Sequence, residues 1–261
     1  MRSVKYLVAI AGAATLFSST VFAMEMAIVP PPMYAPPPVE DFGGWYLRGD
    51  IGFSNQSMKT KEWYTYPALL SLHQDNGFDT AGIFDLGIGY RFNNWLRADI
   101  IGQYRGRSTY HGADIFTFNN AGVITPGADT YIASKSAWLV LANAYVDIGT
   151  WWRVTPFVGA GIGFSRNTIS HFADTNTPTG GVAVGPAASR WNFAWALHTG
   201  LAYKVDPAFT VELGYSYLNL GNATTGILSD FTGVSTNHAI GFKGITSHDL
   251  KLGVRWDLDP P

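Results

Sequence analysis

The sequence contains no cysteine and few charged residues. None of its 261 residues is Cys, and Asp, Glu, Lys and Arg together make up 14%, against roughly 25% in a typical soluble domain. The missing thiols exclude disulfide frameworks, thiolate metal sites and cysteine nucleophiles. A formal net charge of −2 argues against nucleic-acid binding, which needs a basic surface. Because 47% of the residues are hydrophobic and 15% are aromatic, a disordered chain is also excluded.

Long hydrophobic runs are missing as well. The only candidate, residues 6–17, falls short of the ~20 apolar residues of a membrane-spanning helix. Arg2 and Lys5 precede this run, and the small-residue frame Val-Phe-Ala ends at Ala23. This pattern predicts a secretory signal peptide over residues 1–23. Without a later run of helical length, a membrane-embedded mature chain must be a closed β-barrel, because other folds leave backbone groups unpaired in hydrocarbon.

Proline is concentrated directly after this segment. Residues 30–38 read Pro-Pro-Pro-Met-Tyr-Ala-Pro-Pro-Pro, a composition that favours extended polyproline II conformation. A recognition role is one interpretation of such a segment, and an extended spacer is the more common one. We therefore expect residues 24–41 to form a Pro-rich linker ahead of the folded domain.

From residue 44 onward, hydrophobicity alternates with a period of two in eight segments. In the first, Trp45, Leu47, Ile51 and Phe53 lie on one face, opposite polar residues such as Arg48. Each segment reaches the ~9 to 11 residues of a tilted membrane-spanning strand. We predict an all-β fold over residues 42–258, an eight-stranded antiparallel transmembrane β-barrel, followed by a C-terminal tail over residues 259–261.

The connections between the segments alternate in length. They are short at residues 93–94, 150–153 and 205–207, and long and polar at residues 56–78, 108–135, 167–190 and 221–246. This alternation is typical of outer-membrane barrels, which have short periplasmic turns and long extracellular loops. It predicts four large extracellular loops and a periplasmic position for the linker.

Aromatic residues stand mostly at the ends of the apolar stripes, which predicts two interfacial girdles. The predicted members near the short connections are Trp45, Phe92, Trp151, Trp152, Tyr203 and Trp256, and those near the long connections are Phe53, Tyr104, Trp138, Phe164, Phe193 and Tyr217. The alternative is that they are core aromatics of a soluble sandwich. That alternative does not explain why the opposite face is rich in glycine.

The opposite, inward face carries balanced charge. The predicted inward cations are Arg48, Arg91, Arg97, Arg105, Lys204, Lys251 and Arg255, and the predicted inward anions are Asp50, Asp85, Asp99, Asp147, Glu212, Asp249 and Asp257. A selectivity filter would show an excess of one sign. Balance in a barrel that its own side chains can fill favours a structural plug of paired charges. We expect Glu212 to pair with Arg255, because both lie at a similar distance from the short-turn end of neighbouring strands.

The histidines show no spacing typical of a metal site or a catalytic pair. Neither His198 nor His248 has a serine two residues away on its own strand, as a base beside a nucleophile would require. No two histidines stand at a metal-ligand spacing with a carboxylate. We therefore expect no cofactor, no metal and no enzymatic activity. The Gly43-x-Trp45 pattern also occurs in lipocalins, but a lipocalin has an apolar interior.

Several stretches resemble a known family. Residues 143–149, 155–163, 213–217 and 247–256 are similar to the OmpA-like outer-membrane barrels, and in particular to the small surface-antigen porin-family barrels of alphaproteobacteria. The family implies that Lys251, Gly253, Trp256 and Leu258 form the last-strand signal recognised by the outer-membrane assembly machinery. The family's frequent Arg between the two tyrosines of the seventh strand is Ser216 here.

These observations lead to one expected function and two alternatives. We expect a monomeric protein of a Gram-negative outer membrane with a structural and surface-interaction role, in contact with outer-membrane lipids and lipopolysaccharide, and with no nucleic-acid partner. Aromatic clusters at residues 63–66 and 115–118 are candidates for adhesion, or pack among the loops. The alternatives are a narrow, low-conductance channel and a lipid-modifying outer-membrane enzyme.

Overall fold

The structure is a computed structural model that describes residues 43–62, 68–236 and 238–258. The predicted signal peptide, the linker, the C-terminal tail and the aromatic cluster at residues 63–66 lie outside the described residues. Within the described ranges, no helix has the length and apolar character needed to cross a membrane.

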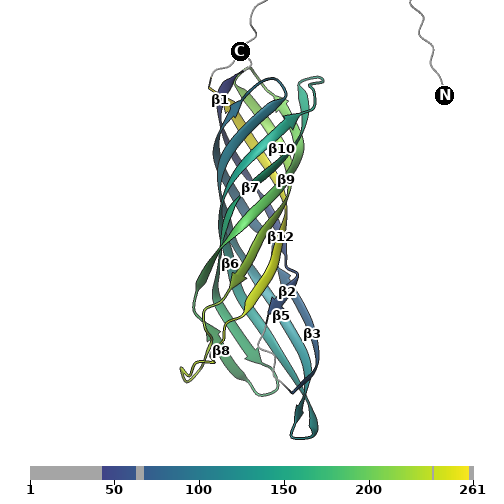
Figure 1. Cartoon of the computed structure of the whole chain (residues 1–261), viewed down its shortest axis with the longest axis vertical. Helices are drawn as coiled ribbons and strands as arrows, with labels where there is room; N and C mark the ends of the chain where they lie inside the picture. The colour runs from purple at the N-terminus through teal and green to yellow at the C-terminus, as the bar shows by residue number, and fades with distance from the viewer. Residues whose placement is uncertain (1–42, 63–67, 237, 259–261) are drawn as a thin grey trace, which may run out of the picture. The chain divides into compact units, whose positions relative to one another are not determined.

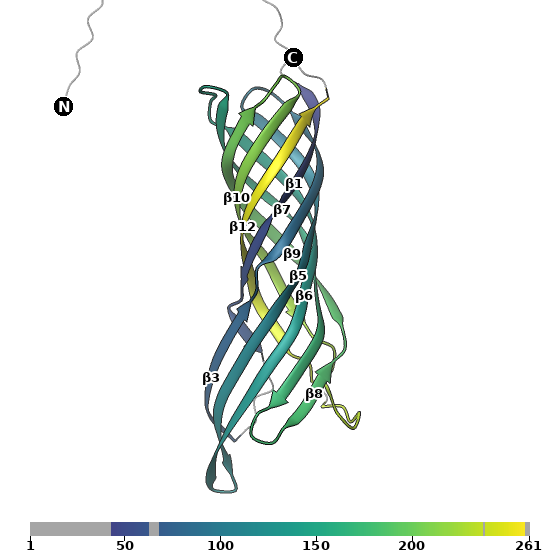
Figure 2. The same cartoon turned by 180° about the vertical axis from the view of Figure 1, so that it is seen from behind.

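Eight long strands form a closed antiparallel ring (Figures 1 and 2). They are β1 (Gly44–Ser57), β4 (Ala81–Arg91), β5 (Leu96–Asn120), β6 (Val123–Asp147), β7 (Val154–Asn176), β9 (Ala188–Lys204), β10 (Phe209–Thr224) and β12 (Gly241–Asp257). The ring closes because β1 pairs with β12 and β7 pairs with β9. These eight strands correspond to the eight alternating segments of the sequence.

Four shorter strands lie at the end of the ring where the long connections gather. They are β2 (Thr60–Glu62), β3 (Leu69–Phe78), β8 (Gly181–Gly185) and β11 (Ser229–Asp230). β2 pairs with β12, β3 with β5, β8 with β7, and β11 with β8. In Figure 1, β3 and β8 lie at the end opposite the short turns.

The side chains of the ring are arranged inside out relative to a soluble protein. Ile51 and Leu86 point outward and are 59% and 75% exposed, whereas Arg48 and Asp50, on the other face of β1, are buried. Successive side chains of a strand point to opposite faces. The period-two alternation therefore produces an apolar outer surface around a partly polar interior.

The three short connections are tight turns. Trp151 and Val154 exchange two backbone hydrogen bonds of 2.9 Å, and the residues between them, Trp152 and Arg153, have φ of 49° and 70°. Positive φ at both central positions defines a type I′ turn, whose twist matches that of the flanking strands. A bulky residue such as Trp152 adopts this conformation at some cost in backbone strain.

The connections at the other end differ from the predicted polar loops. β5 and β6 continue without interruption through residues 108–135 and meet in a tight turn at Ala121 and Gly122, where φ is 50° and 93°. β7 likewise extends to Asn176. The alternation of buried and exposed residues also continues into these segments, but many of the residues involved are polar or small. The polar composition of residues 108–135 therefore predicted a loop, whereas the pairing of β5 with β6 makes this segment a β-hairpin.

The interior of the ring has two zones. Toward the short turns it is filled by charged side chains, as the sequence predicted. Toward the long hairpins it holds an apolar core, in which the Tyr110 and Phe242 rings lie 5.0 Å apart and those of Tyr131 and Phe172 lie 5.9 Å apart. The predicted inward charges thus occupy one half of the ring, because they were chosen from residues on the short-turn side of the hairpins.

Candidate functional site

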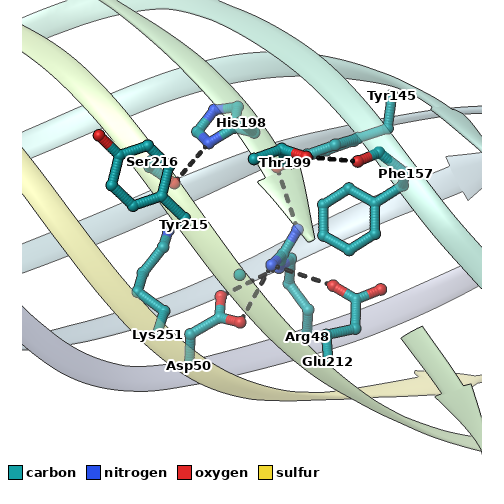
Figure 3. A pocket seen from close by; sticks show the side chains of 11 residues that line it. Arg48, Asp50, Tyr145, Phe157, His198, Thr199, Glu212, Tyr215, Ser216 and Lys251 are labelled. Atoms are coloured by element: carbon teal, nitrogen blue, oxygen red, sulfur yellow. Dashed lines mark hydrogen bonds and ion pairs between the residues drawn. The ribbon is translucent and has the colours of Figure 1, made fainter. Parts of the chain in front are cut away.

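Arg48 lies at the centre of the charged zone (Figure 3). Its Nη2 lies 3.0 Å from Asp50 Oδ1, and its Nη1 lies 2.9 Å from Asp99 Oδ2. Nη1 also donates a hydrogen bond of 3.1 Å to Tyr145 Oη. Because these partners come from β1, β5 and β6, one guanidinium group joins three strands of the ring.

Glu212 on β10 gathers the other cations of this zone. Arg255 Nη1 lies 2.7 Å from Glu212 Oε1, which is the pairing predicted from the sequence. Arg97 Nη2 lies 3.5 Å from the same oxygen, and Arg48 Nη2 lies 3.4 Å from Glu212 Oε2. Arg97 also stacks on the Tyr145 ring, at 4.3 Å from its centroid. These contacts connect β10 with β1, β5 and β12.

The remaining inward carboxylates also have cationic partners. Lys251 Nζ lies 2.9 Å from Asp85 Oδ2, Arg91 Nη1 lies 3.4 Å from Asp257 Oδ2, and Arg97 Nε lies 3.2 Å from Asp147 Oδ1. Arg105 pairs with Asp249 and also donates to two serine hydroxyls. Lys204 is half-buried and takes part in no ion pair within the described part of the chain. The cavity beside Arg48 has a volume of only ≈ 10 Å³, about the space of one water molecule.

A buried histidine completes the lining of that small cavity. His198 Nδ1 lies 2.8 Å from Ser216 Oγ, and its Nε2 lies 3.2 Å from Asn143 Oδ1. Figure 3 shows the His198 ring and the Ser216 hydroxyl facing each other. The sequence analysis considered only serines on the same strand as His198. The contact is instead between neighbouring strands, because His198 lies on β9 and Ser216 on β10. The register of β9 with β10, in which His198 and Ser216 are directly opposite, is what would have predicted this contact.

A second group of charges lies within the hairpins and was not among the predicted residues. Asp114 on β5 stands directly opposite Asp129 on β6, and Asp174 on β7 stands opposite Tyr131. Lys61 Nζ lies 2.8 Å from Asp114 Oδ2 and 3.4 Å from the centroid of the Tyr131 ring. These positions were predicted to lie in loops, so the common inward direction of their side chains was not predicted.

The protonation of this group is perturbed. Burial, reinforced by the negative charge of Asp129, raises the pKa of Asp174 to about 7. Burial also raises the pKa of Asp129, against the hydrogen bond that it accepts from Asn176. Desolvation lowers the pKa of Lys61, although its bond to Asp114 opposes this effect. The carboxylates are thus partly removed from water and lie close together, with Lys61 as the cation that acts on them.

A cavity of ≈ 740 Å³ adjoins these carboxylates. Asp129 and Asp174 line one side of it, and the other lining residues are mostly apolar, among them Phe116, Phe118 and Leu228. In the part of the chain that the structure describes, no group of three or more His, Asp or Glu residues is arranged to hold a metal ion.

The predicted girdle residues occupy the outer surface of the ring. Tyr104 and Tyr217 are half-buried, and the Tyr104 ring lies 4.8 Å from that of Trp138. The exposed members are Trp45, Phe92, Trp151, Trp152, Tyr203 and Trp256 toward the short turns, and Phe53, Trp138, Phe164 and Phe193 toward the hairpins. On the last strand, Lys251 and Gly253 face inward while Trp256 points outward, and Leu258, just beyond the strand, is exposed as well.

The comparisons relate the chain to outer-membrane proteins. A family model described as outer membrane protein beta-barrel domain matches residues 11–257. An uncharacterized protein of Brucella abortus is 30% identical over 217 residues, which cover 75% of each chain. The outer membrane protein PagN of Salmonella typhimurium is 26% identical, over 82% of this chain and 89% of PagN. A putative adhesin of Rickettsia prowazekii is 28% identical, over 82% of this chain and 87% of the adhesin. The crystal structure of Neisserial surface protein A aligns with a TM-score of 0.49 and 17% identity, over 82% of this chain and 97% of that one.

Proposed function

Because the chain belongs to the outer membrane protein beta-barrel domain family and is a protein of the cell outer membrane, we propose that it is a transmembrane barrel of eight strands that serves as a structural and surface-contact protein. The ring would have its short turns in the periplasm and its long hairpins outside the cell. Its function would be exerted by the hairpins, with the ring as their rigid support.

The observation that carries this proposal is the filled interior. The Arg48 and Glu212 contacts connect strands around the ring, and the adjoining cavity has a volume of only ≈ 10 Å³. On the hairpin side of this zone, the apolar core around Phe242 occupies the ring. A conducting pore needs a continuous polar path, so this filling weighs against the narrow channel considered from the sequence.

The relatives support a role at the cell surface. Some of them carry the description putative adhesin, and we extend a surface-contact role to this chain as part of the proposal. The hairpin of β5 and β6 exposes apolar side chains such as Ile115 and Ile124, 63% and 67% accessible. Exposed apolar side chains on projecting segments are suited to contact with a partner surface.

The outer surface of the ring supports the lipid part of the proposal. An apolar belt with aromatic residues at both ends is what barrels present to acyl chains and headgroups. We therefore propose outer-membrane lipids and lipopolysaccharide as its surroundings, the assembly machinery as its partner during insertion, and the monomer as its working form. We also propose that it has no catalytic activity.

Two measurements on the same protein test this proposal. Residues 24–261, refolded into planar bilayers, should give no steady single-channel openings. Whole bacteria of a non-adherent strain that display the protein should bind to an epithelial cell layer above the level of the empty vector. A variant whose residues 112–131 are replaced by Asn-Gly should lose that binding while keeping the ring. Steady openings, or binding no better than the vector, would contradict the proposal.

A further inference from the structure

The cavity at the hairpin end has the dimensions of a small-molecule site. Its volume of ≈ 740 Å³ lies within the roughly 300–1,000 Å³ of typical ligand pockets. It is bounded by β5, β6, β7 and β8 and by the segment that carries β11. Phe116, Phe118 and Leu228 give it an apolar wall, and a site of this kind takes organic molecules with a substantial apolar part.

The charge around the cavity has one sign. Asp129, Asp174 and Asp230 line it, whereas none of its lining residues in the described ranges is a lysine or an arginine. The Asp230 carboxylate accepts hydrogen bonds from the backbone amides of its own turn. Asp174 Oδ1, by contrast, is buried and has no hydrogen-bond partner among the described residues.

The strand register explains why these carboxylates are crowded. Asp114 and Asp129 face each other directly across β5 and β6, and like charges in that position destabilise a sheet. Lys61, the nearby cation, is bonded to Asp114. In the charged zone of the ring, by comparison, the carboxylate of Glu212 has three guanidinium neighbours. Among the described residues, Asp114, Asp129 and Asp174 thus share one nearby cation, Lys61, whereas the single carboxylate of Glu212 has three.

We propose that this cavity binds a small amphipathic organic cation, whose ammonium group contacts Asp129 and Asp174 and whose apolar part lies against Phe116 and Phe118. The ammonium donates to the carboxylate oxygens, including Asp174 Oδ1. The aromatic rings remove the apolar part of the ligand from water. Neither the surface-contact role nor the absence of conductance is needed for this inference.

A fluorescent amine tests the proposal on the chain without its predicted signal peptide. Residues 24–261 are reconstituted in phosphatidylcholine nanodiscs and titrated at pH 8 with dansylcadaverine, with empty nanodiscs as the blank. We expect saturable binding above the blank. N-acetylation of the amine removes the charge and leaves the apolar part, and it should weaken binding at least tenfold.

Two matched variants locate the bound amine. Asp174→Asn keeps the size of the side chain and should weaken binding at least tenfold. Asp79→Asn removes an equal charge from an exposed residue that does not line the cavity, and it should leave the affinity within twofold of the wild type. Circular dichroism establishes that each protein is folded. Equal affinity for the amine and its acetylated form, an unchanged affinity in Asp174→Asn, or no binding above the blank would each overturn the proposal.

Discussion

His198 and Ser216 face each other directly across β9 and β10, and their side chains meet at 2.8 Å between Nδ1 and Oγ. Both residues are buried, and the second ring nitrogen of His198 contacts Asn143 on β6. The imidazole of His198 thus contacts both β10 and β6. These contacts give it a structural role, because they connect three strands at the edge of the charged zone.

Removal of the hydroxyl should destabilise the protein. Ser216→Ala leaves a buried ring nitrogen without its partner, which costs about 1–2 kcal/mol in the free energy of unfolding. Urea titration in lipid bilayers measures the change. Ser71→Ala is the control, because Ser71 makes a similar bond to Thr117 in an exposed position and should change stability by less than about 0.5 kcal/mol. Equal effects of the two substitutions would contradict the structural role of His198.

Glu212 is the residue on which the charged zone depends most. Glu212→Gln removes the carboxylate shared by Arg48, Arg97 and Arg255 and leaves buried Arg255 without an ion-pair partner among the described residues. We expect a loss of about 3 kcal/mol or more in the free energy of unfolding. The control is Glu62→Gln, which removes an ion pair to Lys243 that is largely exposed and should cost less than about 1 kcal/mol. Adding Arg255→Met to Glu212→Gln should restore part of the loss. A double variant less stable than Glu212→Gln alone would contradict this account.

The charged zone was largely predictable from the sequence, because it depends on two regular quantities. The alternation of side chains along a strand predicted that Glu212 and Arg255 point inward. Their distance from the short turns predicted that they lie at the same level along the ring axis. The hairpins were not predictable in the same way. In residues 108–135 the alternation involves residues such as Ser108, Ser134 and Lys135, whose polarity resembles that of a loop. Asp174 could be placed beside Asp129 only once the pairing of β6 with β7 was known.

The sidedness of the ring can be tested because the chain has no cysteine, so that an introduced one is unique. Asn120→Cys, at the tip of the β5–β6 hairpin, should react with a membrane-impermeant maleimide on intact cells. Asn94→Cys, in a short turn at the other end, should react only after the outer membrane is permeabilised. Both residues are exposed, so a difference in labelling reports sidedness. Labelling of Asn94→Cys on intact cells would reverse the proposed orientation.

Two inward glycines provide a test of packing inside the ring. A Cβ atom on Gly163 would overlap the carbonyl oxygen of Val140, whereas the nearest atom to a Cβ on Gly214 is the Thr199 oxygen at 4.0 Å. Gly163→Ala should therefore cost about 1–3 kcal/mol through overpacking, and Gly214→Ala should change stability by less than about 0.5 kcal/mol. Urea unfolding measures both. A neutral Gly163→Ala would mean that β6 and β7 separate more readily than their register implies.

The pKa of Asp174 predicts a pH dependence of stability. Burial raises this pKa from 3.8 to about 7, so the folded state binds the proton more tightly than the unfolded state. The resulting stabilisation is complete below pH 4 and is lost as the pH rises through about 7. Because solvent at the cavity screens the charge, we expect a loss of the order of 1 kcal/mol.

Comparison with Asp174→Asn isolates this effect. The charged and titratable groups that act on Asp174 are Asp114, Asp129 and Lys61, with Tyr131 opposite it on β6 and Asp230 and His238 across the cavity. The stability of the wild type relative to Asp174→Asn should fall between pH 5 and pH 8.5, measured by urea unfolding. A difference that stays constant over this range would show that Asp174 is ionised throughout.

The continuous pairing of β5 with β6 also has a mechanical consequence. Their register runs from Leu96 opposite Val146 to Asn120 opposite Val123, with a single irregularity between Arg105 and Ser108. A tensile load applied at the tip and directed along the strands passes down both arms of the hairpin together. It acts in shear on the ladders that join β5 to β4 and β6 to β7, so that many hydrogen bonds share it at once. The hairpin is therefore stiff along its length, and in the proposed surface-contact role a pull on its tip would be transmitted to the wall of the ring.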